Sequence, residues 1–393
     1  MPDAFIVTGA RSPIGKFMGG LMEVPAPRLG ALAIAEVLKR GKVAPELVDE
    51  VIMGCVLQAG LGQNPARQAA IHGGLPDTIS AVTVNKVCGS GLQAVMQATQ
   101  TIRAGDNDVV IAGGFENMSR APYLLQTART GGFKYGDQTA TDEMIQDGLW
   151  CAFEGCHMGN SAEHIAETHH VSRADQDRFS AQSQQRAAAA WAAGHFNEEV
   201  FSVTVGSGTK AKIIDKDEGY RAETTVEGLA KLRPAFPGGT SVTAGNASTI
   251  NDGSAAILVA SNRGLEKLNA KPLVRVVAYA TSGVAPKDIF IAPVTAVKMV
   301  LQKANLTLND IDYFELNEAF AAQMLACNYD LKIDEAKLNV NGGAIALGHP
   351  IGASGARCLI TLLSVLKQRN AKRGLVSLCL GGGNAVAMIV ERV

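Results

Sequence analysis

Residues 84–94 read Val84-Asn-Lys-Val-Cys-Gly-Ser-Gly-Leu-Gln-Ala94. A β-branched run ends at the start of this stretch, a Gly-Ser-Gly turn follows, and a helical pattern continues to residue 104. A strand, a tight turn and a helix in direct succession are typical of layered α/β proteins. The stretch therefore predicts an α/β fold in which Cys88 lies at the N-terminus of a helix.

The same alternation continues on both sides of this stretch. Continuous apolar runs such as 109–112 favour strands that are buried on both faces. We expect strands over residues 4–8, 50–54, 81–84, 108–113, 274–280, 311–316, 375–380 and 385–390. We expect helices over residues 29–40, 89–104, 293–304 and 352–368.

Two parts of the chain resemble each other. Residues 38–49 match residues 301–312 without gaps, as the end of a helix, a turn and the start of a strand. Further matches follow in the same order: Val84-Asn85 with Val340-Asn341, Gly89-Ser90-Gly91 with Ala353-Ser354-Gly355, and Gly113-Gly114 with Gly381-Gly382. Ordered matches of this kind indicate an internal duplication, which would bring equivalent loops of the two halves together.

The middle of the chain differs from both halves, because its strand pattern weakens and Gly-rich turns surround one strong helix. That helix is expected to begin after Ser172, whose spacing to Asp175 resembles a capping box, and to end before Gly194. We predict an inserted loop domain over 119–245. The first half then comprises residues 1–118 with 246–270, and the second half comprises residues 271–393.

Composition excludes several classes of protein. The 36 basic and 37 acidic residues nearly cancel, so a nucleic-acid partner is not expected. The sequence has no apolar run near the roughly 18 residues that span a membrane, and no membrane partner is expected. Seven cysteines without a Cys-x-x-Cys pair favour reduced thiols and a cytoplasmic protein. A metal site is not expected, since Cys151, Cys156 and His157 lack further ligands at suitable spacing.

Cys88 and His349 are candidate catalytic residues. A thiol at a helix N-terminus meets free N–H groups and the positive end of the helix dipole, which should lower its pKa; the alternative is an inert buried cysteine. His349 lies in an irregular Gly-rich loop, Gly348-His-Pro350, within the segment that only the second repeat carries. It could act as the base toward a thiol or be structural.

Two further candidate residues lie at the ends of predicted strands. Cys379 precedes Gly381-Gly-Gly383, whose free N–H groups could stabilise an oxyanion, although a buried strand cysteine is the alternative. Asn317 follows the strand 311–316 and is either a site residue or a helix cap. Gly89-x-Gly91-x-x-Ala94 with Glu116 also matches a dinucleotide-binding fingerprint, which is a weak signal by itself.

Cys88, Asn317-Glu-Ala-Phe320, Gly348-His-Pro350 and Cys379-x-Gly381, in this order, resemble the thiolase family over nearly the whole chain. The resemblance implies a duplicated, layered α-β-α-β-α core with an inserted loop domain. It also implies a reversible condensation of two acetyl-CoA molecules to acetoacetyl-CoA and CoA, without a metal or redox cofactor. Acyl-CoA and CoA would be the ligands, and the protein would be a homodimer or homotetramer.

The resemblance also assigns roles to residues. Cys88 would take up the acyl group with His349 as its base, and Cys379 would remove the α-proton of the second acetyl-CoA. Asn317, through a water, and His349 would stabilise the enolate. The N–H groups of Cys88 and Gly381 would stabilise the tetrahedral oxyanion. The positions expected to line the CoA site are Leu149, His157, Met158, Arg221, Phe236, Ala244, Ser248 and Phe320. Met158 near the acyl group would favour short chains.

Three alternatives remain at this point. A degradative 3-ketoacyl-CoA thiolase of broader chain length would share every catalytic residue. A dinucleotide-dependent oxidoreductase would use Gly89 and Gly91 but would leave His349 and Cys379 unexplained. A CoA-binding homologue without catalytic activity would not need the four motifs intact.

Overall fold

A ten-stranded mixed sheet forms the centre of the computed structural model, which describes residues 2–393. Nine of the strands follow the order β14-β15-β16-β13-β1-β12-β5-β3-β4. Their bounds are β1 Phe5–Arg11, β3 Glu50–Gly54, β4 Ser80–Val84, β5 Val109–Asn117, β12 Asn251–Ala260, β13 Val274–Gly283, β14 Tyr313–Leu316, β15 Arg373–Leu380 and β16 Asn384–Arg392. The short strand β2 (Gly15–Lys16) pairs with β12.

The sheet consists of two halves that share a pairing pattern over four strands, and the first half adds β4 parallel to β3. In the first half β1, β12 and β5 pair antiparallel and β3 joins parallel to β5; in the second half β13, β16 and β15 pair antiparallel and β14 joins parallel to β15. The two halves of the sheet are joined where Phe5 pairs with Arg275 and Ile6 with Val274. The shared pattern confirms the predicted duplication.

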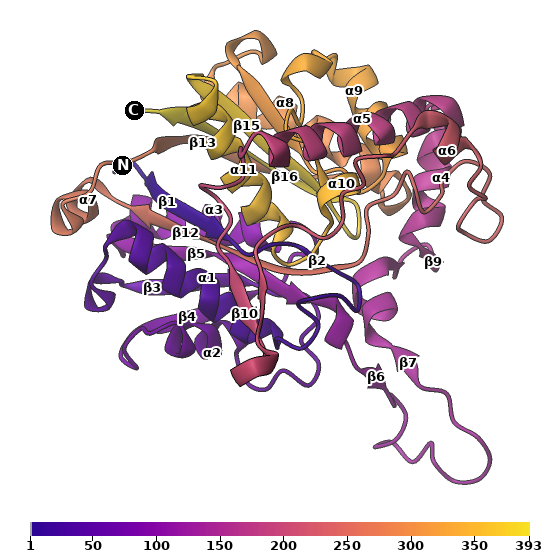
Figure 1. Cartoon of the computed structure of the whole chain (residues 1–393), viewed down its shortest axis with the longest axis horizontal. Coiled ribbons are helices and arrows are strands. Elements are labelled where there is room, and N and C mark those ends of the chain that lie inside the picture. Colours follow the sequence, from indigo (N-terminus) through magenta and orange to yellow (C-terminus); the bar gives the residue numbers. More distant parts are fainter. Residues whose placement is uncertain (1) are drawn as a thin grey trace.

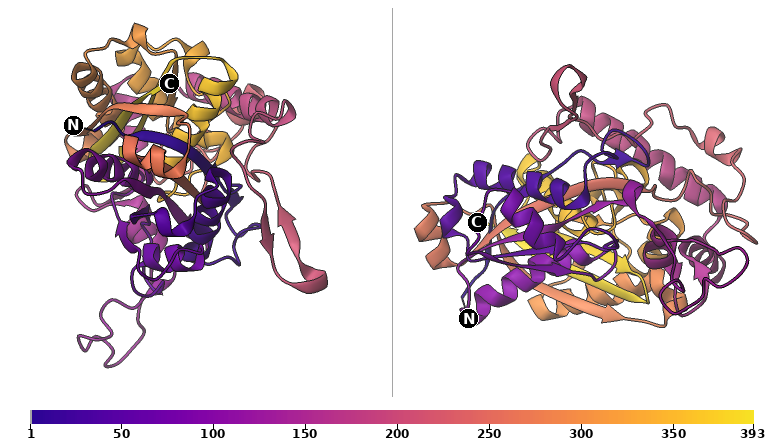
Figure 2. Two further views of the ribbon diagram at one scale, coloured as in Figure 1. Left: turned by 90° about the vertical axis from the view of Figure 1, so that its left-hand side faces the viewer. Right: turned by 90° about the horizontal axis from the view of Figure 1, so that it is seen from below.

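The two sheet halves and three layers of helices make five layers (Figures 1 and 2). Helices α3 (Ser90–Ala104) and α11 (Ser354–Gln368) form the central layer between the two sheet halves. The outer face of the first half carries α1 (Ala26–Gly41) and α2 (Pro65–His72), and that of the second carries α8 (Ala292–Ala304) and α9 (Ala321–Leu331). The order is the predicted α-β-α-β-α.

The repeated glycines Gly91 and Gly355 allow the two central helices to approach each other. A Cβ atom on Gly91 would lie 2.9 Å from the Ala356 nitrogen, and one on Gly355 would lie 2.4 Å from the Leu92 nitrogen. Neither distance leaves room for a side chain. The Gly-x-Gly pattern after Cys88 therefore serves helix packing.

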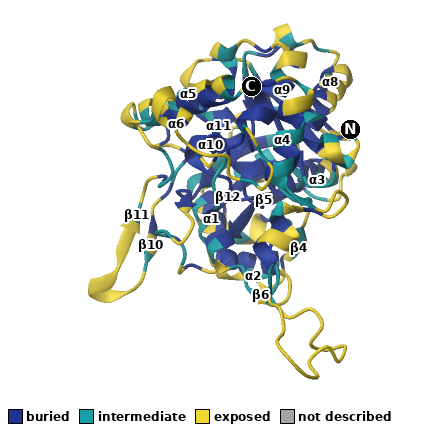
Figure 3. Cartoon of the chain, turned by 90° about the vertical axis from the view of Figure 1, so that its right-hand side faces the viewer, coloured by how far each residue is buried: buried dark blue, intermediate teal, exposed yellow. Residues whose placement is uncertain are grey.

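Residues 119–245 cover one side of the core and extend two arms that are exposed in Figure 3. One arm is the loop between β6 (Tyr123–Leu124) and β7 (Thr141–Asp142), and the other is the hairpin β10–β11. The remaining elements of this segment are β8 Trp150–Cys151, β9 Cys156–His157, α4 Met158–Thr168, α5 Arg173–Ala192, β10 Val203–Val205, β11 Lys212–Ile214 and α6 Val226–Ala230. Ser172 caps α5 by accepting a hydrogen bond from the Asp175 N–H, as predicted. Two short helices lie outside this segment, α7 Asn262–Leu268 and α10 Ala344–Leu347.

The sequence-based expectations miss one central strand, β12. Its sequence begins Asn251-Asp-Gly-Ser254, which favours a turn, yet all ten residues of the strand are buried. Tertiary contacts explain the difference, because β12 lies between β1 and β5 and its polar start is held by partners far along the chain. Asn251 donates to the Gly15 carbonyl, and Asp252 accepts from Ser119.

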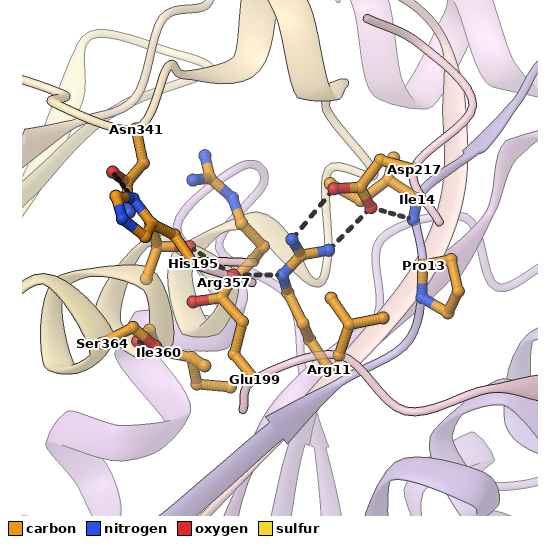
Figure 4. Close-up of polar contacts among 12 residues, drawn as sticks. Arg11, Pro13, Ile14, His195, Glu199, Asp217, Asn341, Arg357, Ile360 and Ser364 are labelled. Carbon is orange, nitrogen blue, oxygen red and sulfur yellow. Dashed lines mark hydrogen bonds and ion pairs between the residues drawn. The ribbon is translucent and has the colours of Figure 1, made fainter. Parts of the chain in front are cut away.

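A buried arginine ties the inserted segment to the core (Figure 4). Arg11, at the end of β1, is fully buried. Its Nε donates to Glu199 Oε1 at 2.7 Å, and its two Nη atoms donate to the two carboxylate oxygens of Asp217 at 2.7 and 2.9 Å. Asp217 also accepts a hydrogen bond from Trp191 Nε1 at 3.2 Å.

Replacing Arg11 by Met should destabilise the protein by about 3–5 kcal/mol, because two buried carboxylates would lose their cation. Urea denaturation followed by tryptophan fluorescence measures this, since Trp191 lies in the network. The control is Arg263→Met, which removes an arginine that pairs with Asp108 but is 69% exposed; it should cost less than about 1 kcal/mol. Equal losses for the two variants would contradict the prediction.

Candidate active site

A cavity of ≈ 630 Å³ lies where loops of both sheet halves face the inserted segment. Cys88, His349, Cys379 and Gly381 line it, so the structure brings four of the five predicted catalytic positions together. All eight positions predicted for the CoA site line the same cavity: Leu149, His157, Met158, Arg221, Phe236, Ala244, Ser248 and Phe320. Other lining residues were not predicted, among them Lys16, Phe17, Val87, Met118, Glu218 and Phe290.

Cys88 lies at the predicted place, just before the N-terminal turn of α3. Gly89 is the N-cap of this helix. A Cβ on Gly89 would lie 2.2 Å from a methyl carbon of Leu380, so glycine allows the nucleophile loop to pack against the end of β15. Val87, directly before Cys88, has φ 48°. This is an unfavourable region for a β-branched residue, and backbone strain of this kind concentrates at functional sites.

The predicted lowering of the Cys88 pKa is wrong. Burial raises the pKa of the thiol to about 12, and the nearby Glu116 adds to the increase. The N–H groups of Cys88 and Gly381 oppose this increase without overcoming it. Dehydration of the thiolate outweighs these two N–H groups, so the resting side chain is a neutral thiol that needs a base.

His349 is held through its backbone N–H and its ring nitrogen Nδ1. Its backbone N–H donates to Asn251 Oδ1 at 2.9 Å. Its Nδ1 lies 2.6 Å from Ser354 Oγ, and this hydroxyl donates its only hydrogen to the Pro350 carbonyl at 2.8 Å. With the hydroxyl hydrogen assigned to the Pro350 carbonyl, Nδ1 carries the proton and donates to Ser354, which leaves Nε2 as an acceptor.

Burial keeps this imidazole neutral. Burial, and after it the positive charge of Arg357, lower the pKa of His349 to about 3. A neutral imidazole and a neutral thiol that line one cavity are groups between which a proton can be transferred when a substrate is bound.

Asn317 does not line the cavity but lies directly behind His349. Its Nδ2 is 3.5 Å from His349 Nε2, and its Oδ1 lies 3.7 Å from the Cys358 thiol. The side chain is buried. Asn317 is not a helix cap, since α9 begins four residues later with Phe320 as its N-cap.

Cys379 and Gly381, at the end of β15, form another part of the cavity lining. Burial raises the pKa of the Cys379 thiol well above its usual value, and a negative charge on Cys88 would raise it further. Gly382 and Gly383 have φ values of 82° and 86°, a left-handed turn that suits glycine. The turn begins at Gly381, whose N–H reaches the Cys88 sulfur.

Four rings, those of His157, Phe236, Phe320 and Phe290, form a row along an apolar part of the cavity lining. His157 stacks on Phe236 with ring centroids 4.8 Å apart, and Phe320 meets Phe236 edge-on. Phe290 contacts Phe320 in the same way. Burial lowers the pKa of His157, so its ring is neutral and fits an apolar wall. The charged lining residues Lys16, Glu218 and Arg221 belong to the same cavity.

Glu116 has a role that excludes the dinucleotide alternative. A dinucleotide fingerprint needs an acidic side chain that reaches a ribose, but Glu116 is fully buried. It accepts hydrogen bonds from the N–H groups of Val56, Leu57 and Gly352 at 2.9–3.1 Å. Glu116 thereby links the first half to the loop after His349.

In residues 2–393, no group of three or more His, Cys, Asp and Glu side chains could hold a metal ion. All seven cysteines there are free thiols. None of the helices in this part of the chain is long and apolar enough to cross a membrane.

Two family models match almost the entire chain, "Thiolase, N-terminal domain" over residues 4–263 and "Thiolase, C-terminal domain" over residues 270–392. The chain belongs to the thiolase family. The chain is 50% identical to an acetyl-CoA acetyltransferase of Cupriavidus necator and 51% identical to one of Pseudomonas aeruginosa, each over 100% of both chains. A crystal structure of the Bacillus anthracis acetyl-CoA acetyltransferase matches with a TM-score of 0.97 and 40% identity, covering 100% of this chain and 99% of that one.

Family membership agrees with the fold described above. The mixed, duplicated sheet with its central helix pair is the thiolase fold. Four of the five expected catalytic positions and all eight expected CoA positions of this thiolase line one cavity, and Asn317 lies behind His349.

Proposed function

We propose that this thiolase is an acetyl-CoA C-acetyltransferase, which condenses two acetyl-CoA molecules to acetoacetyl-CoA and CoA and also catalyses the reverse thiolysis. The observation that carries the proposal is the convergence of Cys88, His349 and Cys379 on one cavity that the eight expected CoA positions also line. Full-length relatives at 50–51% identity carry this activity in their names.

The first half-reaction follows from the neutral resting groups. His349 Nε2 takes the proton of Cys88, and the sulfur attacks the acetyl-CoA carbonyl carbon. The N–H groups of Cys88 and Gly381 stabilise the oxyanion. The C–S bond to CoA then breaks. Because Cys379 rests as a thiol, it can become a base only by giving up its proton, and the departing CoA sulfur is the group that accepts it. The products are S-acetyl-Cys88, CoA, a Cys379 thiolate and a His349 imidazolium.

The second half-reaction restores both groups. The Cys379 thiolate removes an α-proton from a second acetyl-CoA. Asn317 and the protonated His349 stabilise the enolate oxygen, Asn317 through a water. The enolate carbon attacks S-acetyl-Cys88, forming the new C–C bond and releasing the Cys88 thiolate, which takes the proton from His349. Two half-reactions through a covalent intermediate give ping-pong kinetics.

We assign the CoA moiety to the row of rings His157, Phe236 and Phe320, and its charged end to Arg221. The apolar rings suit the pantetheine arm. Arg221 is an exposed cation at the cavity. CoA serves as substrate and product, and the proposed chemistry requires no cofactor.

The proposal includes the domain division given above, with the inserted loop domain over 119–245 as the CoA-binding part. Six of the eight expected CoA positions come from this segment, which supports the assignment. A homodimer or homotetramer stays a prediction.

Thiolysis of 3-ketoacyl-CoA substrates of increasing chain length separates the two kinds of thiolase. We expect activity confined to acetoacetyl-CoA, because Met158 occupies part of the cavity. A broad profile would favour the degradative 3-ketoacyl-CoA thiolase instead.

Met158→Ala should then shift the preference toward longer chains. The space gained by removing the side chain should raise kcat/KM for the next longer substrate relative to acetoacetyl-CoA by about tenfold or more. Met299→Ala is the control, because Met299 is exposed on α8 and lies away from the cavity lining. An unchanged ratio in Met158→Ala would assign the chain-length limit to another residue.

A further inference from the structure

One face of α11 contacts both residues of the proposed enolate site. Ser354 bonds to His349, and one turn later Cys358 contacts Asn317 Oδ1. Arg357 and Thr361 continue along this side of the helix toward two buried carboxyl groups, those of Glu315 and Glu199. The helix thus spans the distance between the His349 loop and β14.

Arg357 and Glu315 form a buried contact that the catalytic steps above do not use. Both side chains are 2% exposed, and Arg357 Nη1 lies 3.7 Å from Glu315 Oε2. Neither Glu315 oxygen has a hydrogen-bond partner among the described residues, and the same holds for Nε and Nη1 of Arg357. Buried polar groups without partners are rare and costly, so a role other than stability is expected for this pair.

The pair joins the two elements that carry the enolate site. Glu315 lies on β14, two residues before Asn317, and Arg357 lies on α11 beside Cys358. Figure 4 shows Arg357 in the same buried region as Glu199 and Arg11. Burial raises the pKa of Glu315 to about 8 although Arg357 opposes the increase. The carboxyl group therefore takes up a proton near neutral pH, and the guanidinium carries the charge.

We infer that Arg357 and Glu315 are positioning residues that hold Asn317 at the correct place behind His349 for the enolate step. The inference rests on the proposed function. The backbone N–H of Asn317 donates to the Ser377 carbonyl, but its side chain contacts His349 and Cys358 of α11. His349 has its own anchors, Ser354 and Asn251. Loss of the pair should therefore displace the Asn317 side chain and spare the step in which His349 serves Cys88. A displacement of about 1 Å can cost about 10²-fold in rate.

The test compares the two half-reactions in Arg357→Met and in the double variant Glu315→Met/Arg357→Met. The double variant is included because Arg357→Met alone could fail to fold. Replacing both members of a buried pair by apolar residues is often neutral for stability. Acetylation of Cys88 is followed by mass spectrometry. Enolate formation is followed by exchange of the acetyl-CoA methyl hydrogens with deuterium from D₂O.

We expect deuterium exchange to fall about ten- to hundredfold in both variants. The acetylation rate should not fall, because loss of the Arg357 charge raises the pKa of His349 and leaves it a stronger base toward Cys88. Thr361→Val is the matched control, since it removes a hydrogen bond to Glu199 from the same face of α11; it should leave the ratio of the two rates unchanged. A parallel loss of both rates, or no loss of either, in the folded double variant would overturn the inference.

Asn317→Ala distinguishes this inference from the proposed function. If Asn317→Ala abolishes exchange while the double variant does not impair it, only the positioning role of Arg357 and Glu315 fails. If Asn317→Ala leaves exchange intact, the proposed role of Asn317 fails and the inference fails with it.

Discussion

Cys88→Ala should lower both condensation and thiolysis by about 10⁴- to 10⁶-fold, the range found when a covalent nucleophile is removed. The residual activity should be this low because no other lining residue can replace the nucleophile. Cys379 is the only other thiol in the cavity lining, and the proposed mechanism needs it as the base. Acetyl-CoA should still bind, since the row of rings and Arg221 are untouched.

The measurement is the release of CoA from acetyl-CoA together with the mass of the protein. Wild type should gain one acetyl group on Cys88 and the variant none. Cys156→Ala is the control, because Cys156 is a partly buried cysteine that does not line the cavity. Production of acetoacetyl-CoA by Cys88→Ala at the wild-type rate would disprove the mechanism.

The raised pKa of the partly buried Cys88 has a consequence for its reactivity. A thiol with a pKa of about 12 has little thiolate at neutral pH, so its reactivity toward substrate depends on His349. Alkylation by iodoacetamide, which needs the thiolate, should accelerate as the pH rises through the alkaline range. A rate that levels off below pH 9 would mean that the site stabilises the thiolate after all.

The sequence predicted the parts of the site that lie in short local motifs. Cys88 before a Gly-Ser-Gly turn, His349 in its own Gly-rich segment and Cys379 before three glycines each follow from neighbouring residues. The eight CoA positions followed from the resemblance to a family, because their locations in an irregular segment cannot be derived from periodicity.

Tertiary partners were not predictable in this way. Ser354 fixes the tautomer of His349, yet in the sequence it appears only as the repeat of Ser90. The sequence placed Glu116 in a dinucleotide-binding fingerprint. In the structure it accepts hydrogen bonds from backbone N–H groups of both halves. The prediction of a lowered Cys88 pKa was wrong for the same reason, since burial depends on chain segments that are far away in the sequence.

Cys379→Ala should separate the two half-reactions. The α-proton of a thioester is weakly acidic, so the enolate needs a base, and loss of a general base costs about 10²- to 10⁴-fold. The departing CoA sulfur needs help far less, because a thiol has a pKa near 8.5 and leaves readily as the thiolate. Cys88 should therefore still be acetylated, while exchange of the methyl hydrogens and condensation are lost.

The same two measurements, acetylation by mass spectrometry and exchange in D₂O, test this expectation. Cys327→Ala is a suitable control, because Cys327 is a buried cysteine of the same half whose thiol donates to the Phe290 carbonyl and does not line the cavity. If Cys379→Ala lost acetylation as fully as exchange, the thiol would be needed mainly as the acid toward CoA. If exchange survived, another group would be the base. Only retained acetylation with lost exchange fits a thiol that rests neutral, gives its proton to CoA and then takes one from carbon.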